Sequence, residues 1–263
     1  MIKLKSPAEI EIMKKGGEIL SEVLFLTLSQ VKAGVSLAEL DKFAEKEIVK
    51  RKAEPAFKRV KGYQWTICAC VNDVVVHGIP NDYLIQPGDV VGVDCGVYFQ
   101  GFNTDSSWTI RVEGGQDTDL KDRFLAAGQN ALLSALKKVK IGNYIYDISR
   151  SMQNSIEKAG YSIVRTLVGH GVGKDLHEEP EIPNFVTQDR EKTPLITEGM
   201  TLAVEIIYNL GDREVVYKGN DGWTIATKDG RISGLFEVTV VPTFHGSLVL
   251  TKLDSILEKF SYL

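Results

Sequence analysis

Three carboxylates stand in the middle of segments that are otherwise apolar. Asp94, Glu205 and Glu237 each interrupt a run of Val, Leu, Ile and Phe, and Asp105 follows Asp94 across a predicted hairpin. An ionised carboxylate inside a buried strand must be paired, must bind a cation or must face water. One such residue is more often a satisfied core or surface group. Four carboxylates in the most apolar strands favour a shared site.

Histidines in glycine-flanked turns add nitrogen donors to this set. His170 stands in the segment Gly-His-Gly-Val-Gly at 169–173, where the glycines let a ligand or other backbone approach closely. His177 follows after a short loop, and His77 ends a predicted strand. A lone histidine in a turn is usually only solvated, and His245 is given that interpretation.

The charge of the four carboxylates indicates what they bind. If they converge, they carry about four negative charges, which a protein interior does not hold without compensation. Two divalent cations would neutralise them. One histidine among four carboxylates is an oxygen-rich donor set, which suits Mn²⁺ or Fe²⁺ and tolerates Co²⁺ or Zn²⁺. The expected cofactors are therefore two divalent metal ions per chain.

Strands and helices must position these residues. Two helices are predicted to start at the caps Ser6 and Ser36, the first with a capping box closed by Glu9. Helical periodicity predicts two more helices over 118–139 and 144–159. Runs rich in β-branched residues predict strands over 67–76, 90–98, 161–168, 200–209 and 234–241. If the hairpin turn centres near residues 99–100, Asp94 and Asp105 face each other or nearly so.

A repeat divides the chain into two similar halves. Val-Lys-Ala-Gly at 31–34 recurs as Val-Lys-Ile-Gly at 139–142, and residues 85–94 resemble residues 196–205, at offsets of 108 and 111. The second pair of segments ends on Asp94 and on Glu205. This order predicts an α+β fold in a single domain over 1–263, with halves of about 1–113 and 116–245 that share one sheet.

Composition narrows the function classes. The 263 residues are 43% hydrophobic and 25% charged, as in ordinary globular proteins. A net charge of −4 gives no basic field, so nucleic acid is not the expected partner, although the basic run at 58–61 could touch RNA. The three cysteines lack zinc-knuckle spacing and do not suggest a disulfide scaffold. With neither a signal-peptide core nor a long apolar stretch, we expect a cytoplasmic protein without membrane contact.

The ordered motifs of this chain resemble those of the type I, bacterial-like methionine aminopeptidases. They are residues 71–80, the hairpin from 94 to 105, the segments 169–173 and 177–180, and residues 221–224. The resemblance covers residues 2 to 243. It implies the pita-bread fold, in which two pseudo-symmetric halves surround one curved, mainly antiparallel sheet with helices on the outside. The span from His177 to Glu205 has no room for the helical insert of type II enzymes.

The resemblance also implies an activity and roles for residues. The activity is removal of the initiator methionine from nascent polypeptides whose second residue is small, by two-metal hydrolysis. The implied metal ligands are Asp94, Asp105, His170, Glu205 and Glu237. Asp105 and Glu237 would bridge the ions, Glu205 would shuttle the proton, and His77 and His177 would contact the substrate at the scissile bond. The implied methionine pocket consists of Phe57, Tyr63, Cys68, Leu176 and Trp223.

Two residues depart from the family pattern. Ile206 replaces the proline that commonly follows the metal-binding glutamate, and Val238 replaces a common histidine after Glu237. Neither is a ligand, so we expect any effect to fall on the geometry around the ligands. The resemblance further implies a monomer whose partner is the nascent amino terminus, and it leaves room for a transient ribosome contact.

Two alternatives stay open at this point. Aminopeptidases P and prolidases share the fold and the ligands but cleave next to proline, and they carry a large amino-terminal domain that we do not expect here. A catalytically silent relative would instead bind ribosomes or RNA. Such relatives lose ligands, whereas all five ligand positions are filled in this chain.

Overall fold

The first two helices begin at their predicted caps. In the computed structural model, which describes residues 1–263, α1 (Pro7–Leu28) and α2 (Leu37–Lys50) follow Ser6 and Ser36. Each serine accepts a hydrogen bond from the N–H three residues on, and the glutamate there accepts one from the serine N–H, which satisfies otherwise unpaired helix donors. The later helices are α3 (Thr118–Leu136), α4 (Ile145–Lys158) and α5 (Asp254–Phe260), with short 3-10 turns η1 (Phe57–Arg59) and η2 (Arg190–Lys192).

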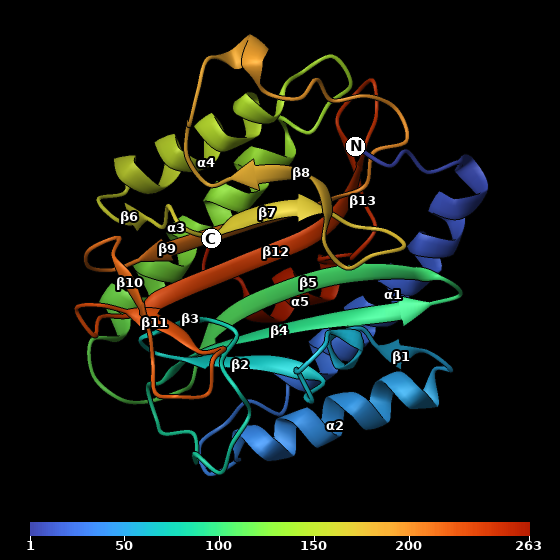
Figure 1. The fold of residues 1–263 in the computed structure, drawn as a ribbon. Coiled ribbons are helices and arrows are strands. Elements are labelled where there is room, and N and C mark those ends of the chain that lie inside the picture. Colours follow the sequence, from blue (N-terminus) through green and yellow to red (C-terminus); the bar gives the residue numbers. More distant parts are fainter.

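One antiparallel sheet of ten strands forms the centre of the molecule (Figure 1). Its main path runs β1 (Glu54–Pro55), β4 (Val90–Phe99), β5 (Phe102–Arg111), β12 (Ser233–Pro242), β9 (Leu202–Asn209), β7 (Val168–Gly171) and β8 (Glu178–Pro183). Branching from it are β2 (Ile67–Val71), β6 (Ser162–Ile163) and β13 (Ser247–Val249). A smaller sheet contains β10 (Val215–Tyr217), β11 (Ile225–Thr227) and β3 (Val74–Val76).

Helices cover one face of the large sheet. Figure 1 shows them behind the strands, with α1 packed on β4 and β5 and α3 packed on β9 and β12. The largest apolar cluster lies between the helices and the strands and includes the buried side chains of Trp108, Phe124 and Phe236. None of the helices combines the length and the apolar composition that crossing a bilayer requires. The opposite face of the sheet is left to the functional site.

The sequence repeat has a structural counterpart. Gly34 and Gly142, which are 108 residues apart, both have positive φ (86° and 92°). Each donates its N–H to a residue of the second repeated segment, Gly34 to the carbonyl of Ile85 and Gly142 to that of Ile196. Both halves therefore hold their helix pair against the turn before the central strands in the same way.

Three predicted elements differ from the structure. The strand expected over 67–76 is two strands, because Asn72 has φ 53° and turns the chain between β2 and β3. The strand expected over 161–168 is also divided, into β6 and β7, and β7 continues through the glycine-rich His170 motif. The hairpin turn lies at Gln100 and Gly101, one residue later than predicted, because these two residues have positive φ.

Candidate metal and substrate site

The register of four strands brings three carboxylates into one row. Asp94 on β4 pairs with Ser107 on β5, Ser107 pairs with Glu237 on β12, and Glu237 pairs with Glu205 on β9. Directly paired residues of antiparallel strands point to the same face. All three carboxylates therefore leave the sheet on the face opposite the helices.

A second row adds the remaining aspartate and the histidine. Asp105 precedes Ser107 by two residues on β5, and His170 on β7 pairs with Ala203, two residues before Glu205. Since side chains alternate along a strand, both residues share the face of the first row. Asp94 and Asp105 are thus diagonal neighbours and do not face each other directly. The expectation of direct opposition was wrong by the one-residue shift of the turn.

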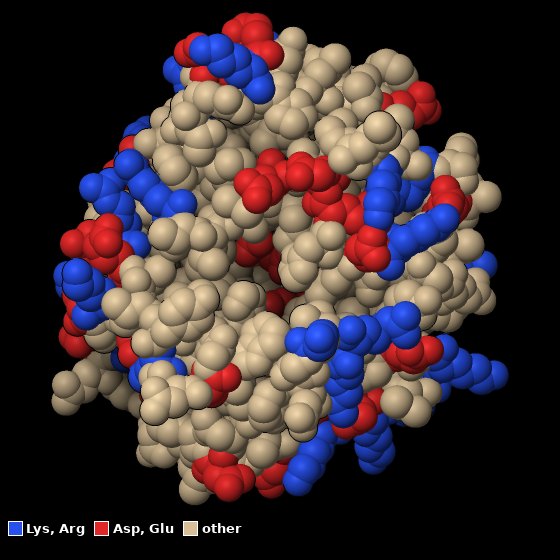
Figure 2. All heavy atoms as spheres, viewed as in Figure 1, with Lys and Arg blue, Asp and Glu red and all other residues tan.

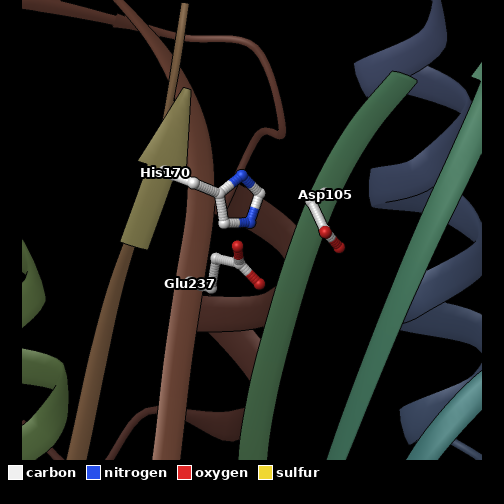
Figure 3. A group of neighbouring side chains, drawn as sticks. All are labelled: Asp105, His170 and Glu237. Carbon is white, nitrogen blue, oxygen red and sulfur yellow. The ribbon is translucent and has the colours of Figure 1, made fainter. Parts of the chain in front are cut away.

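Asp105, His170 and Glu237 converge closely enough to share an ion. One ligand atom from each of them lies within 4.8 Å of the other two, and all three residues are buried. Figure 3 shows these side chains reaching from β5, β7 and β12 into the same space between the strands. Asp94 and Glu205 flank this space from the outer strands of the first row.

His170 is prepared to act as a ligand. Its Nδ1 lies 2.9 Å from the carbonyl oxygen of Gly171, which can only accept, so Nδ1 carries the proton. Nε2 then keeps a free lone pair for a metal ion. Burial, together with the nearby His177, lowers the pKa of His170 to about 4, so the ring is neutral at physiological pH.

Without a cation the carboxylates hold protons. Burial raises the pKa of Asp94 to about 7. Burial and then the charges of neighbouring carboxylates hold the pKa of Asp105, Glu205 and Glu237 well above the ordinary range. Oδ1 of Asp94 is also buried without a hydrogen-bond partner. An orphaned carboxylate oxygen among repelling carboxylates fits divalent cations, which would satisfy the oxygen and neutralise the charge.

All twelve residues predicted for the site line one cavity of about 570 Å³. In Figure 2 the face opposite the helices is hollowed near its centre, with acidic atoms at the bottom of the hollow. Sequence reasoning missed three apolar members of the lining: Val60, Val76 and Leu235. Leu235 could have been found, because it precedes Glu237 by two residues and strand alternation places both on one face.

Aromatic side chains form the apolar part of the cavity. The ring of Tyr63 packs edge-on against Trp223 and Phe57, at centroid distances of 5.2 and 6.3 Å. The Tyr63 hydroxyl donates to the carbonyl of Ile67 at 2.9 Å, which fixes the ring. Cys68 pairs with Asp94 in the β2–β4 register, so this wall adjoins the carboxylates. The result is an apolar slot that opens directly onto the proposed metal ligands.

His77 and His177 lie at the cavity but outside the close ligand group. The His177 ring centroid is 4.4 Å from that of His170, and the His77 ring centroid is 6.3 Å from that of Trp223. Burial lowers the pKa of both histidines, so both rings are neutral at pH 7. A neutral imidazole can donate one hydrogen bond and accept another.

Ile206 and Val238 lie away from the site. Each is adjacent in sequence to a carboxylate of the first row, so its side chain points to the opposite face of the sheet. Both are fully buried in the main apolar cluster against the helices. The departures from the family pattern are therefore changes in core packing.

Comparisons with known proteins agree with this geometry. A family model described as metallopeptidase family M24 matches residues 11–240. The methionine aminopeptidase of Clostridium perfringens is 38% identical over 251 residues, which cover 95% of this chain and 99% of that protein. The methionine aminopeptidase of Escherichia coli is 37% identical over 252 residues, which cover 95% and 94%.

Solved structures give the same result for the fold. The crystal structure of the methionine aminopeptidase from Thermotoga maritima superposes with a TM-score of 0.91 at 36% identity, covering 96% of this chain and 100% of that one. The prolidase from Pyrococcus horikoshii shares the fold with a TM-score of 0.75 at 24% identity, and the match covers 63% of its length. The predicted α+β, pita-bread architecture is confirmed.

Proposed function

Since this chain belongs to metallopeptidase family M24, we propose that it removes methionine from the amino terminus of proteins and peptides whose second residue is small. The observation that carries this proposal is the direct junction between a five-residue metal-ligand set and an apolar, aromatic-lined slot. The ligands supply hydrolytic chemistry, and the slot has the chemistry of an unbranched thioether side chain, which gains favourable sulfur–aromatic contacts. The enzyme is a metallo-aminopeptidase.

Five residues would hold two divalent ions. Asp105 and Glu237 would bridge them, since they lie in the close group with His170. Asp94 would complete one site, and His170 with Glu205 the other, in keeping with their places on opposite sides of the bridging pair. When bound, divalent ions supply Lewis-acid activation of water and of a carbonyl group. The donor set suits Mn²⁺ or Fe²⁺ and accepts Co²⁺ or Zn²⁺.

The other side chains would orient the substrate and move the proton. Phe57, Tyr63 and Trp223 would hold the methionine side chain away from water. His77 and His177, neutral at pH 7, would donate hydrogen bonds to the peptide group that is cleaved. Glu205, whose pKa is raised by burial, would carry a proton from the attacking water to the leaving amine.

The substrates of such an enzyme are peptide amino termini. We further propose that it acts in the cytoplasm, as a monomer, on chains that are leaving the ribosome. Three free, buried cysteines are in keeping with a reducing compartment. Figure 2 shows Lys and Arg side chains gathered on one side of the hollow, a distribution that would favour transient contact with ribosomal RNA.

Peptide hydrolysis tests the proposal. The metal-stripped enzyme is supplied with Mn²⁺ or Co²⁺ and given Met-Gly-Met-Met, Leu-Gly-Met-Met, Met-Val and Met-Leu peptides, and an X-Pro peptide. We expect Met-Gly to be cleaved fastest and rates to fall gradually from Gly to Leu at the second position, because one methylene costs only about 1–3 kcal/mol in a simple pocket. Equal rates on the Met-Gly and Leu-Gly peptides, or cleavage of the X-Pro peptide alone, would overturn the proposal.

A further inference from the structure

The loop that carries Leu176 and His177 spans residues 172–177 and joins β7 to β8. Both side chains line the cavity. Neither residue takes part in a backbone–backbone hydrogen bond, so nothing in the local backbone fixes them. Their position depends on how the two ends of the loop are held.

The first end is held by Asn103, at the start of β5. Its N–H donates to the carbonyl of Gly173 at 2.7 Å. Its side-chain amide donates to the carbonyls of Gly173 and Lys174 at 2.9 and 3.0 Å. These three bonds tie the beginning of the loop to the hairpin that carries Asp105.

The second end is held by Glu178, the residue directly after His177. Its Oε1 accepts the N–H of Asp175 at 3.1 Å, which closes the loop on itself. Its Oε2 lies 2.5 Å from Nζ of Lys5. The side chains of Lys5 and Glu178 are only 4% and 1% exposed, so this ion pair is almost entirely removed from water.

Lys5 reaches the loop from the segment before α1. Its N–H donates to the carbonyl of Gly199 at 2.7 Å, which fixes that segment beside the turn that precedes β9. A Cβ at Gly173 would lie 2.7 Å from Lys5 Nζ and 2.9 Å from Glu178 Oε1. The last glycine of the His170 motif therefore makes room for the ion pair.

We propose that Lys5 is a positioning residue, which acts through Glu178 to hold His177 against the scissile bond and Leu176 against the methionine side chain. The inference rests on the proposed function for the roles of these two cavity residues. Without the ammonium group, Glu178 becomes a buried carboxylate without a counter-charge, and such a group turns to water or takes up a proton. Either change weakens its bond to Asp175 and releases the loop.

Lys5→Met tests this inference, because it keeps the length and apolar contacts of the side chain and removes the charge. Lys3→Met is the matched control: Lys3 pairs with Asp175 from the same segment, but these side chains are 54% and 65% exposed and such pairs contribute little. On a Met-Ala peptide we expect kcat of Lys5→Met to fall about 10–100-fold, as when an outer residue that orients a site is lost. Lys3→Met should stay within about twofold of the wild type.

Further measurements separate positioning from general stability. Calorimetric Mn²⁺ binding should be unchanged in Lys5→Met, and adding Glu178→Gln should recover much of the lost kcat, because the neutral amide no longer needs a counter-charge. Should Lys5→Met fail to fold, Lys5→Gln, which keeps a donor without the charge, gives a milder form of the same loss. A lowered melting temperature with wild-type kcat and KM, loss of Mn²⁺ binding, or a double variant as slow as Lys5→Met would each overturn the inference. Failure of the proposed function is seen separately, as a wild-type enzyme that does not cleave the peptide.

Discussion

Glu205 and Glu237 are direct register partners on β9 and β12, so their carboxylates leave adjacent strands on the same face of the sheet. Like charges placed opposite each other destabilise a sheet. Burial raises the pKa of both groups, and the charge of Asp94 adds to the effect on each. Such a pair is compatible with a folded sheet when protons or cations neutralise it, and this links the stability of the enzyme to its metal ions.

Replacing a proposed bridging ligand should remove both metal binding and turnover. In Glu237→Gln we expect calorimetry to find fewer bound Mn²⁺ ions per chain than in the wild type. The rate should fall by more than the roughly 10²–10³-fold that loss of one transition-state hydrogen bond costs. Asp189→Asn is the control, because this carboxylate is 75% exposed. Normal turnover in Glu237→Gln would contradict the ligand assignment.

The metal-free protein should lose stability as the pH rises above 6.5. The pKa of Asp94 is raised to about 7 by burial, and burial with neighbouring charges holds the pKa of Asp105, Glu205 and Glu237 well above the ordinary range. These groups stay protonated in the folded chain after the unfolded chain has ionised, so their stabilising contribution is lost as the pH passes the folded-state pKa. His170 has the opposite sign, but its contribution is complete above its ordinary pKa of 6.5.

Thermal melting measures this effect. With EDTA, the melting temperature should fall between pH 6.5 and pH 9. With excess Mn²⁺ it should instead rise over the same range, because metal ions compete with protons for the same oxygens. A melting temperature in EDTA that increases with pH would show that the carboxylates are already ionised in the metal-free fold.

The two cavity histidines should act on turnover and not on metal binding. His77→Ala and His177→Ala should each lose about 10²–10⁴ in kcat/KM, the usual effect of a positioned proton donor. Their Mn²⁺ affinity should match that of the wild type. His245→Ala is a matched control, because His245 is exposed in the loop between β12 and β13. Loss of metal affinity in His77→Ala would instead make His77 a ligand.

Trp223 should contribute to the selection of methionine over leucine. Each sulfur–aromatic contact is worth about 0.3–1.5 kcal/mol, so Trp223→Ala should narrow the preference for Met-Gly over Leu-Gly by roughly twofold to tenfold. Trp65→Ala is the control: Trp65 packs on Tyr63 at 5.3 Å but does not line the cavity. Equal preferences in Trp223→Ala and the wild type would exclude this wall as the thioether site.

Two adjacent glycines of α1 should respond oppositely to alanine. At Gly16 an added Cβ would meet only ordinary contacts, 3.4 Å from Phe99 Cβ, so Gly16→Ala should stabilise the protein by about 0.5–1 kcal/mol through helix propensity. At Gly17 the Cβ would run into the backbone carbonyl of Leu250, and Gly17→Ala should cost about 1–3 kcal/mol. Urea unfolding of both variants measures the difference, and a destabilised Gly16→Ala would contradict it.

The ligand set could be predicted from sequence because charge inside apolar strands is a strong local signal. The same signal does not give register. A turn one residue later than expected moved Asp94 opposite Ser107, since strand pairing depends on the φ angles of Gln100 and Gly101.

Other features depend on contacts between distant segments. Strand β8 contains two prolines and three glutamates, a composition that is poor for strands and is tolerated because β8 lies at the edge of the sheet. The pairing of Lys5 with Glu178 joins residues 173 positions apart. Neither feature has a periodic pattern in the sequence, so both could be recognised only in the folded chain.

The place of β12 in the sheet also determines when a newly made copy of this enzyme becomes active. Glu237 pairs with Ser107, and the ribosome adds the 130 residues between these positions in roughly 6 to 26 seconds at ordinary rates of synthesis. During that time β5 has an open edge, because the strand that covers it does not yet exist, and an unpaired edge invites contact with other chains. The half-made enzyme is therefore its most aggregation-prone form, and it cannot process any other protein until almost all of its own chain has been synthesised.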